Sequence, residues 1–239
     1  HRHVQKRYSL EKGEMTMETG MQELLMEFLK TLPINIIIII LSAALGLLFA
    51  VLLTFVRLKR IPVISQLADL YVSFARSVPG LILLFIAYFG IPKVLPLIGL
   101  GTYDISPMHA AIISMGFYHS GYISEVFRPA YLAVEKSQHE AADSLGYTPM
   151  QKFFRIILPQ MVPVALPGYG NALVYLIHDT SLIFAIGIVD IMGTAELSIA
   201  RSYGTNQILI YFIIALMFSA MCFTTDGLVR KLEKRVAIR

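Results

Sequence analysis

Residues 34–56 read INIIIIILSAALGLLFAVLLTFV, a run without a single charged side chain. The run begins after Pro33 and ends before the basic residues Arg57, Lys59 and Arg60. A helix needs about 20 apolar residues to cross the roughly 30 Å hydrocarbon core of a bilayer. This stretch therefore predicts a membrane-spanning helix with basic residues at its carboxyl end.

The composition of the whole chain favours the same class. Of its 239 residues, 56% are hydrophobic and only 15% are charged, whereas soluble domains contain about 25% charged residues. The net charge of +4 could suggest nucleic-acid binding. Its basic residues, however, gather at the ends of apolar runs, where membrane topology accounts for them. We therefore expect a lipid bilayer as the surroundings and no nucleic-acid partner.

Four further apolar runs are long enough to span a bilayer, which predicts an all-α membrane protein with about five transmembrane helices. These runs are residues 78–98, 108–127, 169–189 and 208–225. Residues 61–76, which contain Asp69 and Arg76, are shorter and less apolar. We expect them to form an interfacial or partly inserted lead-in to the second span.

The distribution of Lys and Arg sets the expected orientation. With the N-terminus outside and the C-terminus in the cytoplasm, the inner loops and tail hold twelve basic residues. The outer loops hold only Lys93 and Arg201. Because basic residues accumulate on the cytoplasmic side, this orientation is the predicted one.

The segment before the first span is expected to be a partly mobile tail and a surface helix, residues 1–30. Leu25, Phe28, Leu29 and Leu32 recur at helical spacing and predict one apolar face. A helix lying on the outer leaflet and a simple extension of the first span are equally good interpretations. No cleavable signal peptide is expected, and the natural start could be Met15 or Met17. Residues 31–239 are expected to form a single transmembrane domain.

The inner loop between the third and fourth spans, residues 137–159, carries helix start and stop signals. Ser137 with Glu140 predicts a capping box, and Gly146 stands where a left-handed residue would end the helix. Thr148, Pro149 and Gln151 predict a second capped start. Pro159, Pro163 and Pro167 are then expected to interrupt the chain. The loop is too short for a core of its own, which predicts either a connection or a docking elbow for a partner.

The same loop resembles the EAA loop of ABC-importer permeases. The family pattern is Glu-Ala-Ala, three residues, Gly, nine residues, Ile, one residue, Leu-Pro. This sequence matches it at Glu140, Ala141, Ala142, Gly146, Ile156, Leu158 and Pro159. In that family the loop supplies the coupling helices that sit in a groove of the ATP-binding subunit. The resemblance thus assigns ATPase coupling to Glu140, Ala141, Ala142, Gly146, Leu158 and Pro159.

Further matches are similar to the polar amino acid branch of that family, which includes histidine-, glutamine-, arginine- and cystine-type permeases. Residues 120–128 resemble its Ser-Ala-Tyr-x-Ala-Glu-x-x-Arg stretch, and residues 178–182 resemble its Lys-Asp-Thr-Ser-Leu. Residues 76–79 resemble its Arg-Gly-Thr-Pro. The chain departs from the pattern where His178 replaces Lys, Pro129 replaces Gly and Ser77 replaces Gly.

The resemblance implies a type I ABC-importer permease fold and a multi-pass protein of the bacterial cytoplasmic membrane. It also implies a second permease chain in a homo- or heterodimer, two ATP-binding subunits, and an extracytoplasmic binding protein that delivers a polar amino acid or cystine. ATP and Mg²⁺ would be bound by the partner ATPase, with no cofactor in this chain. Transport would proceed by alternating access.

Four consecutive polar residues, His178 to Ser181, lie near the middle of the fourth span. A charged side chain at mid-bilayer costs about 2.5–3.5 kcal/mol, so these residues must face inward, pair, or unwind the helix. They are candidates either for the substrate path or for an internal pair. His178 and Asp179 are adjacent, so on a regular helix their side chains diverge and make a poor acid–base pair.

A second polar stripe on the third span contains Ser114, Tyr118, Tyr122 and Glu125 at helical spacing. Glu125 could receive a substrate ammonium or pair with Arg128. The candidate substrate path is therefore Ser114, Tyr118, Tyr122, Glu125, His178, Asp179, Thr180 and Ser181, with Asp179 and Tyr118 nearest the solute. Gly116 and Ser120 are interpreted as helix-packing residues.

The sequence shows no catalytic motif: neither a P-loop nor a nucleotide-binding, zinc-protease or serine-hydrolase signature occurs. His109 and His119 are expected to hydrogen-bond within the helix bundle rather than bind a metal, and Cys222 is expected to be a packed side chain. We expect no enzyme activity in this chain. The alternatives are an ion- or proton-coupled secondary transporter, which would show an inverted repeat, an intramembrane enzyme, and, less readily, an exporter.

Overall fold

The computed structural model describes residues 2–100 and 104–237, which are helical and contain no strand. The first helix, α1 (Arg2–Lys59), runs through Pro33 without a break. It matches the second interpretation of residues 21–32, a continuous extension of the first span. Phe28 is fully buried and packs with Leu24 and Leu32 against α9 and α10, whereas Leu25 and Leu29 are exposed.

The remaining elements follow in chain order, mostly as short helices joined by tight turns. They are α2 (Ile64–Ser77), α3 (Gly80–Phe85), the π-helical turn η1 (Ile86–Gly90), α4 (Ile91–Val94), η2 (Leu95–Ile98), α5 (Pro107–Leu132), α6 (Lys136–Ser144), α7 (Pro149–Lys152), the π-helical turn η3 (Phe153–Ile157), α8 (Leu158–Asp179), the 3-10 helix η4 (Thr180–Ile186), α9 (Ile191–Arg201) and α10 (Gln207–Ala237).

Helices occur at all five predicted spans, but fewer stretches meet a length and composition test for crossing a membrane. Among the described residues three do so: Met21–Lys59, Gly80–Ile98 and Gln207–Val236. A fourth is counted if Pro149–Ile186 and the following Ile191–Arg201, bent by 51°, are taken as one broken span. The predicted third span coincides with α5, which contacts α1, α2 and α8. Because α5 faces other helices, it can carry small and polar side chains that lipid would penalise.

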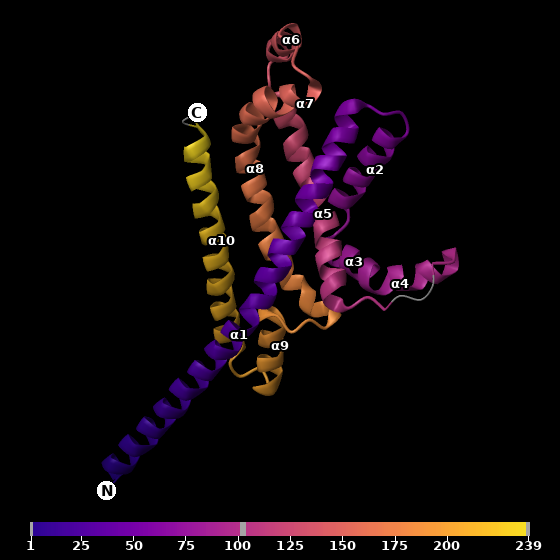
Figure 1. Cartoon of the computed structure of the whole chain (residues 1–239). Helices are drawn as coiled ribbons and strands as arrows, with labels where there is room; N and C mark the ends of the chain where they lie inside the picture. Colours follow the sequence, from indigo (N-terminus) through magenta and orange to yellow (C-terminus); the bar gives the residue numbers. More distant parts are fainter. Residues whose placement is uncertain (1, 101–103, 238–239) are drawn as a thin grey trace.

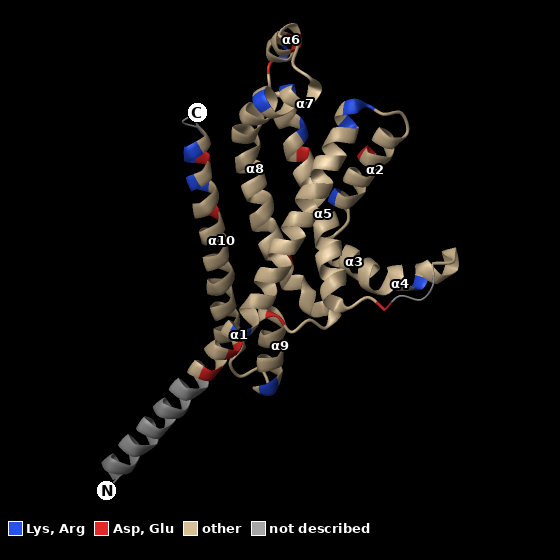
Figure 2. Ribbon diagram, in the orientation of Figure 1, with Lys and Arg blue, Asp and Glu red and all other residues tan. Residues whose placement is uncertain are grey.

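The helices α1, α5, α8 and α10 run alongside one another, α3 lies beside α5, and α4 extends away from the bundle (Figure 1). The lead-in residues form α2, which packs on α5 rather than standing apart from the bundle. The two termini lie at opposite ends of the molecule (Figure 1). Basic residues gather at the end where α1 stops, where α7 lies and where α10 finishes (Figure 2).

Close approach of α1 to α5 depends on two glycines. A Cβ on Gly116 would lie 2.8 Å from Cδ2 of Leu45, and one on Gly46 would lie 3.0 Å from the carbonyl oxygen of Gly116. Both distances are shorter than ordinary van der Waals contact, so the crossing requires residues without side chains. Ser120, fully buried on the same helix, donates to the carbonyl of Phe117. The interpretation of Gly116 and Ser120 as packing residues is confirmed.

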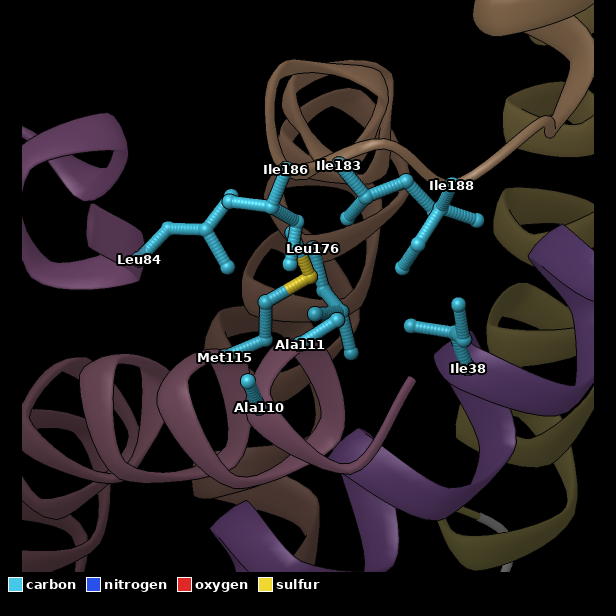
Figure 3. Packing of buried hydrophobic residues seen from close by; sticks show 9 residues of the cluster. All are labelled: Ile38, Leu84, Ala110, Ala111, Met115, Leu176, Ile183, Ile186 and Ile188. Atoms are coloured by element: carbon cyan, nitrogen blue, oxygen red, sulfur yellow. The ribbon is translucent and has the colours of Figure 1, made fainter. Parts of the chain in front are cut away.

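The main apolar core surrounds the segment that follows α8. Ile183, Ile186 and Ile188 meet Leu84 of α3, Ile38 of α1 and side chains of α5 (Figure 3). Burial of such side chains is the chief favourable contribution to packing. The turn after Asp179 is thus held inside the molecule by three different helices.

Candidate functional site

The centre of the candidate site is a contact between α5 and α8. Nε2 of His119 lies 3.0 Å from Oδ2 of Asp179. The imidazole is 2% exposed and the Asp179 side chain 28% exposed. His119 therefore hydrogen-bonds within the bundle, as expected, and the third and fourth predicted spans face each other at this level. Of the two alternatives for Asp179, substrate path or internal pair, the structure contains an internal pair, and its histidine is His119.

Two tyrosines on α5 flank this contact. The hydroxyl of Tyr118 lies 3.3 Å from that of Tyr122, and its ring meets the His119 ring edge-on with centroids 5.0 Å apart. Tyr122 also donates to the carbonyl of Arg76 at 3.4 Å. The predicted stripe of hydroxyls thus lies beside Asp179, and the side chains of Tyr118 and Tyr122 are only partly buried.

Glu125 lies on the same helix but is engaged elsewhere. Its Oε1 lies 2.7 Å from NH1 of Arg57, and its Oε2 lies 3.2 Å from NH1 of Arg76. Nε of Arg57 in turn contacts Asp69 at 2.6 Å. The expected alternative pairing of Glu125 with Arg128 is therefore wrong. The partners come instead from α1 and α2, and both carboxylate oxygens face a guanidinium.

The four polar residues from His178 to Ser181 point in different directions. Nε2 of His178 lies 3.3 Å from Sγ of Cys222 on α10, whereas Asp179 faces α5. Thr180 is fully buried, and its hydroxyl donates to the carbonyl of Ile177 at 2.7 Å. Ser181 donates to the carbonyl of His178. Thr180 therefore faces inward and Asp179 pairs, which are two of the three alternatives, whereas the helix does not unwind but tightens into a 3-10 helix at Thr180.

Ser114 and Tyr118 border a groove of about 290 Å³ between α2, α3 with η1, and α5. Its other walls are mainly apolar, with Phe74, Ile86 and Phe117 among them. Ser114 is buried and lies one turn of α5 before Tyr118. Of the predicted path residues on α5, Ser114 and Tyr118 therefore border an apolar groove, and Tyr118 also lies against His119, the partner of Asp179.

No group of three or more metal-type ligands comes together in the part of the chain that the structure describes. His109 instead lies 2.6 Å from the hydroxyl of Ser106, which caps α5. Cys222 is half-buried on α10.

The loop between α5 and α8 forms an elbow, residues 136–157, at the end of the bundle opposite the N-terminus (Figure 1). Gly146 has φ of +73° and ends α6, as expected, with the amide of Tyr147 donating to the carbonyl of Ala142. The Thr148–Gln151 capping box is present, with reciprocal hydrogen bonds of 3.3 and 3.0 Å. Both sequence predictions are confirmed.

Two predictions about the elbow are wrong. The Ser137–Glu140 capping box does not form, because the N-cap of α6 is the extended Glu135, two residues before Ser137, and the helix starts at Lys136. Ser137 donates to Glu135, and Glu140 pairs with Lys136. The prolines do not interrupt the chain either: Pro163 and Pro167 lie inside α8, and Pro159 lies in its first turn. A π-helical turn precedes Pro159, and Nε2 of the Gln160 side chain donates to the carbonyl of Ile156.

The elbow presents an apolar tip. Leu145 and Met150 are 76% and 68% exposed, while Ala142 is buried. Glu140 and Ala141 are exposed beside them, Leu158 is half-buried and Pro159 is exposed. Lys152 contacts Asp143 at 2.6 Å and ties α7 to α6. This surface is rigidly built yet covered by nothing within the described chain.

Sequence reasoning missed two polar groups. It placed His119 in a bundle without naming Asp179 as its partner, and it passed over Asn35, a lone amide inside the first apolar run. Asn35 is fully buried and hydrogen-bonds to Asp190. The signal was available, because a buried amide must find a partner and a polar residue inside an apolar span marks a contact.

The chain has clear relatives. Residues 44–238 match the family model described as "Binding-protein-dependent transport system inner membrane component". The L-cystine transport system permease protein TcyL of Bacillus subtilis is 34% identical over 205 residues, 86% of this chain and 85% of that protein. The histidine/lysine/arginine/ornithine transport system permease protein HisQ of Escherichia coli is 34% identical over 174 residues, 70% of this chain and 75% of that protein.

Solved structures show the same fold. A chain from an amino acid ABC transporter crystallised with histidines superposes with a TM-score of 0.77 at 25% identity, covering 91% of this chain and 97% of that chain. A chain of the MetNI methionine ABC transporter in an inward-facing form superposes with a TM-score of 0.69 at 19% identity, covering 92% of this chain and 98% of that chain.

Proposed function

The chain belongs to the family of binding-protein-dependent transport system inner membrane components, and on this basis we propose that it is the transmembrane subunit of an ATP-driven amino acid importer. The substrate is a polar amino acid or cystine, delivered by an extracytoplasmic binding protein. ATP and Mg²⁺ are bound by a separate ATPase. Two permease chains and two ATPase subunits form the working complex, with the N-terminus outside and the C-terminus in the cytoplasm.

The observation that supports this proposal best is the elbow. Its tip exposes Leu145 and Met150 next to the Glu140–Ala141 pair. Exposed apolar side chains held by a rigid backbone are typical of an interface. ATP-driven closure of the two ATPase subunits would draw the elbows of the two permease chains together. Because α5 and α8 join the elbow to the His119–Asp179 contact, this movement would open the path to the outside.

We place the substrate path along Ser114, Tyr118, Tyr122, His178, Asp179, Thr180 and Ser181. The Asp179 carboxylate would receive the substrate ammonium, and the hydroxyls of Tyr118 and Tyr122 would offer hydrogen bonds beside it. Glu125 belongs to the same face but has both oxygens beside guanidinium groups. We propose that these ion pairs hold α5 against α1 and α2, and that Glu125 does not contact the ammonium.

The competing sequence interpretations are less well supported. An ion- or proton-coupled secondary transporter would not need an exposed elbow, and the relatives in the comparisons are named as permeases of transport systems. An intramembrane enzyme would need cooperating side chains, yet His178 faces Cys222 while Asp179 faces His119.

Co-purification tests the assembly. The tagged permease, expressed with its genomic neighbours, should retain an ATPase subunit. Leu145→Asp should release that subunit, because a charge would enter an apolar contact. Gln138→Asp puts the same charge on an exposed polar site of the same helix and should retain it. Reproducible absence of an ATPase from the wild-type complex would contradict the proposal.

The path is tested separately by transport. The complex is reconstituted with its binding protein in liposomes, and uptake and ATPase stimulation are measured with L-cystine, L-histidine and L-glutamine in turn. Asp179→Asn and Tyr118→Phe should each weaken stimulation by the transported amino acid. If both variants behave as wild type, this placement of the path is wrong.

A further inference from the structure

A fully buried polar cluster joins α1 to the segment that follows Asp179. It consists of Asn35, Thr180 and Asp190, none of which has exposed surface. Nδ2 of Asn35 donates to Oδ2 of Asp190 at 2.9 Å, and Oδ1 of Asn35 accepts from the amide of Ile191 at 3.1 Å. Burial of unpaired amides and carboxylates is costly, so such a cluster persists only because its members satisfy one another.

The amide of Asn35 touches both ends of one short segment. At the start, its Nδ2 lies 3.5 Å from Oγ1 of Thr180, the first residue of η4. At the far end it bonds Asp190 and Ile191, where α9 begins. Between them the chain turns at Gly187, whose φ is +87°. A single side chain of α1 therefore closes residues 180–191 into a loop.

The other groups of the cluster are paired with the backbone of the helices on either side of this loop. Oδ1 of Asp190 accepts from the amide of Gly193 at 2.9 Å and caps α9. The hydroxyl of Thr180 donates to the carbonyl of Ile177. Apolar contacts from Ile183, Ile186 and Ile188 fill the space around η4 (Figure 3). The apolar contacts are nondirectional, whereas the Asn35 hydrogen bonds require one relative position of α1 and the loop.

The loop begins at the peptide bond that follows Asp179. We propose that Asn35 is a positioning residue for the substrate path, because it fixes where η4 starts and so holds the Asp179 carboxylate against His119. This inference rests on the proposed function, since it assigns Asn35 a role through a residue placed in that path. Asn35 itself touches no solute; it acts through Thr180 and Asp190.

The chemistry of the cluster permits an exchange test. Asn35→Asp alone would set two carboxylates against each other, and Asp190→Asn alone would set two amides together. In the double variant the carboxylate of residue 35 accepts from the amide of Ile191 and from the side-chain amide of residue 190. The side-chain oxygen of residue 190 still accepts from the amide of Gly193. The Thr180 hydroxyl has a single proton, which it donates to the carbonyl of Ile177, so the double variant restores the pair between positions 35 and 190 but not the 3.5 Å contact with Thr180.

The experiment uses the complete complex with its ATPase and binding protein in liposomes. L-cystine, L-histidine and L-glutamine are the probes, and both the half-stimulating concentration and the maximal ATPase rate are measured. Asn35→Ala should raise the half-stimulating concentration of the active probe about tenfold, as expected when directed hydrogen bonds that orient a binding group are lost. The exchanged double variant should return within about threefold of wild type, since a restored pair recovers most of its coupling.

Ser42→Ala is the matched control. Ser42 is also fully buried on α1, but its hydroxyl donates to Ile112 of α5 at 3.3 Å and does not reach η4. It should leave the half-stimulating concentration unchanged. If Asn35→Ala does not fold, Asn35→Asp is compared with the double variant in its place.

The inference is overturned if the Asn35 variants change only the melting temperature or the maximal rate, or match Ser42→Ala. It is also overturned if the exchange restores folding but not the half-stimulating concentration. A wild-type complex that no amino acid stimulates would instead contradict the proposed function, so the two failures are distinguishable.

Discussion

Replacing Glu125 by glutamine should destabilise the permease without changing its response to the amino acid. The variant keeps the shape of the side chain and removes its charge. In the structure both carboxylate oxygens of Glu125 face guanidinium groups, those of Arg57 and Arg76. The change therefore acts on the packing of α5 against α1 and α2, and no oxygen is left over for a substrate ammonium.

The size of the effect follows from the two contacts. The Arg57 contact is 2.7 Å long with the Arg57 side chain 9% exposed, and a hydrogen bond to a charged group contributes about 1.5–3 kcal/mol. The Arg76 contact is 3.2 Å long and half exposed, so it contributes about 0–1 kcal/mol. Glutamine retains one accepting oxygen, which leaves a net loss of about 2 kcal/mol. For a chain of this size, that lowers the melting temperature by about 4–8 °C.

The melt is followed by far-ultraviolet circular dichroism, because the chain is helical and contains no Trp. Arg128→Gln serves as control and should change stability by less than about 0.5 kcal/mol. An equal loss of stability in both variants would support the hypothesis that Glu125 pairs with Arg128. If Glu125→Gln instead shifts the half-stimulating amino acid concentration while the melt is unchanged, Glu125 contacts the solute and our assignment is refuted.

Three further outcomes are expected. Gly116→Ala should destabilise the α1–α5 crossing by about 1–3 kcal/mol through overpacking, whereas Gly227→Ala, with open space around its Cβ, should be neutral or stabilising by up to about 1 kcal/mol; thermal melts compare the two. Thr148→Ala removes a cap that contributes about 1 kcal/mol, so amide exchange should accelerate in α7, and unchanged exchange would show that the cap is unimportant. Glu140→Ala loses only an exposed ion pair with Lys136, which contributes at most about 1 kcal/mol, so the melt should shift by less than in Thr148→Ala. Because we assign Glu140 to ATPase coupling, coupled uptake should nevertheless fall; a melt shift equal to that of Thr148→Ala would point to a structural role.

Turn and cap signals, which involve only neighbouring residues, predicted the local structure of the elbow most reliably. Gly146 adopts the left-handed conformation and Thr148 pairs with Gln151 because both features are decided within four residues. The predicted capping box at Ser137 does not form, because the extended Glu135 caps α6 instead and the helix starts earlier. The prediction that prolines interrupt α8 was wrong, because a membrane helix tolerates proline when the carbonyls that lose their partner find another one.

The partners of the site could not be read from spacing. Glu125 pairs with residues on α1 and α2, and Asp179 pairs with a histidine on α5. These contacts depend on how the helices pack, and helical periodicity reports only which side chains share a face. Asn35 was the readable exception, since a lone amide in an apolar run already requires a partner.

Two helices, α5 and α8, connect the elbow to the His119–Asp179 contact. From His119 to the end of α5 at Leu132 is about 20 Å, and from Asp179 back to the start of α8 at Leu158 is about 30 Å, at 1.5 Å rise per residue. Both helices are unbroken over these lengths. A tilt of about 0.1 radian imposed at the tip would displace the far end by about 2–3 Å, by the same geometry. That displacement is comparable with a hydrogen-bond length, so a small rotation at the elbow is mechanically sufficient to part the two side chains.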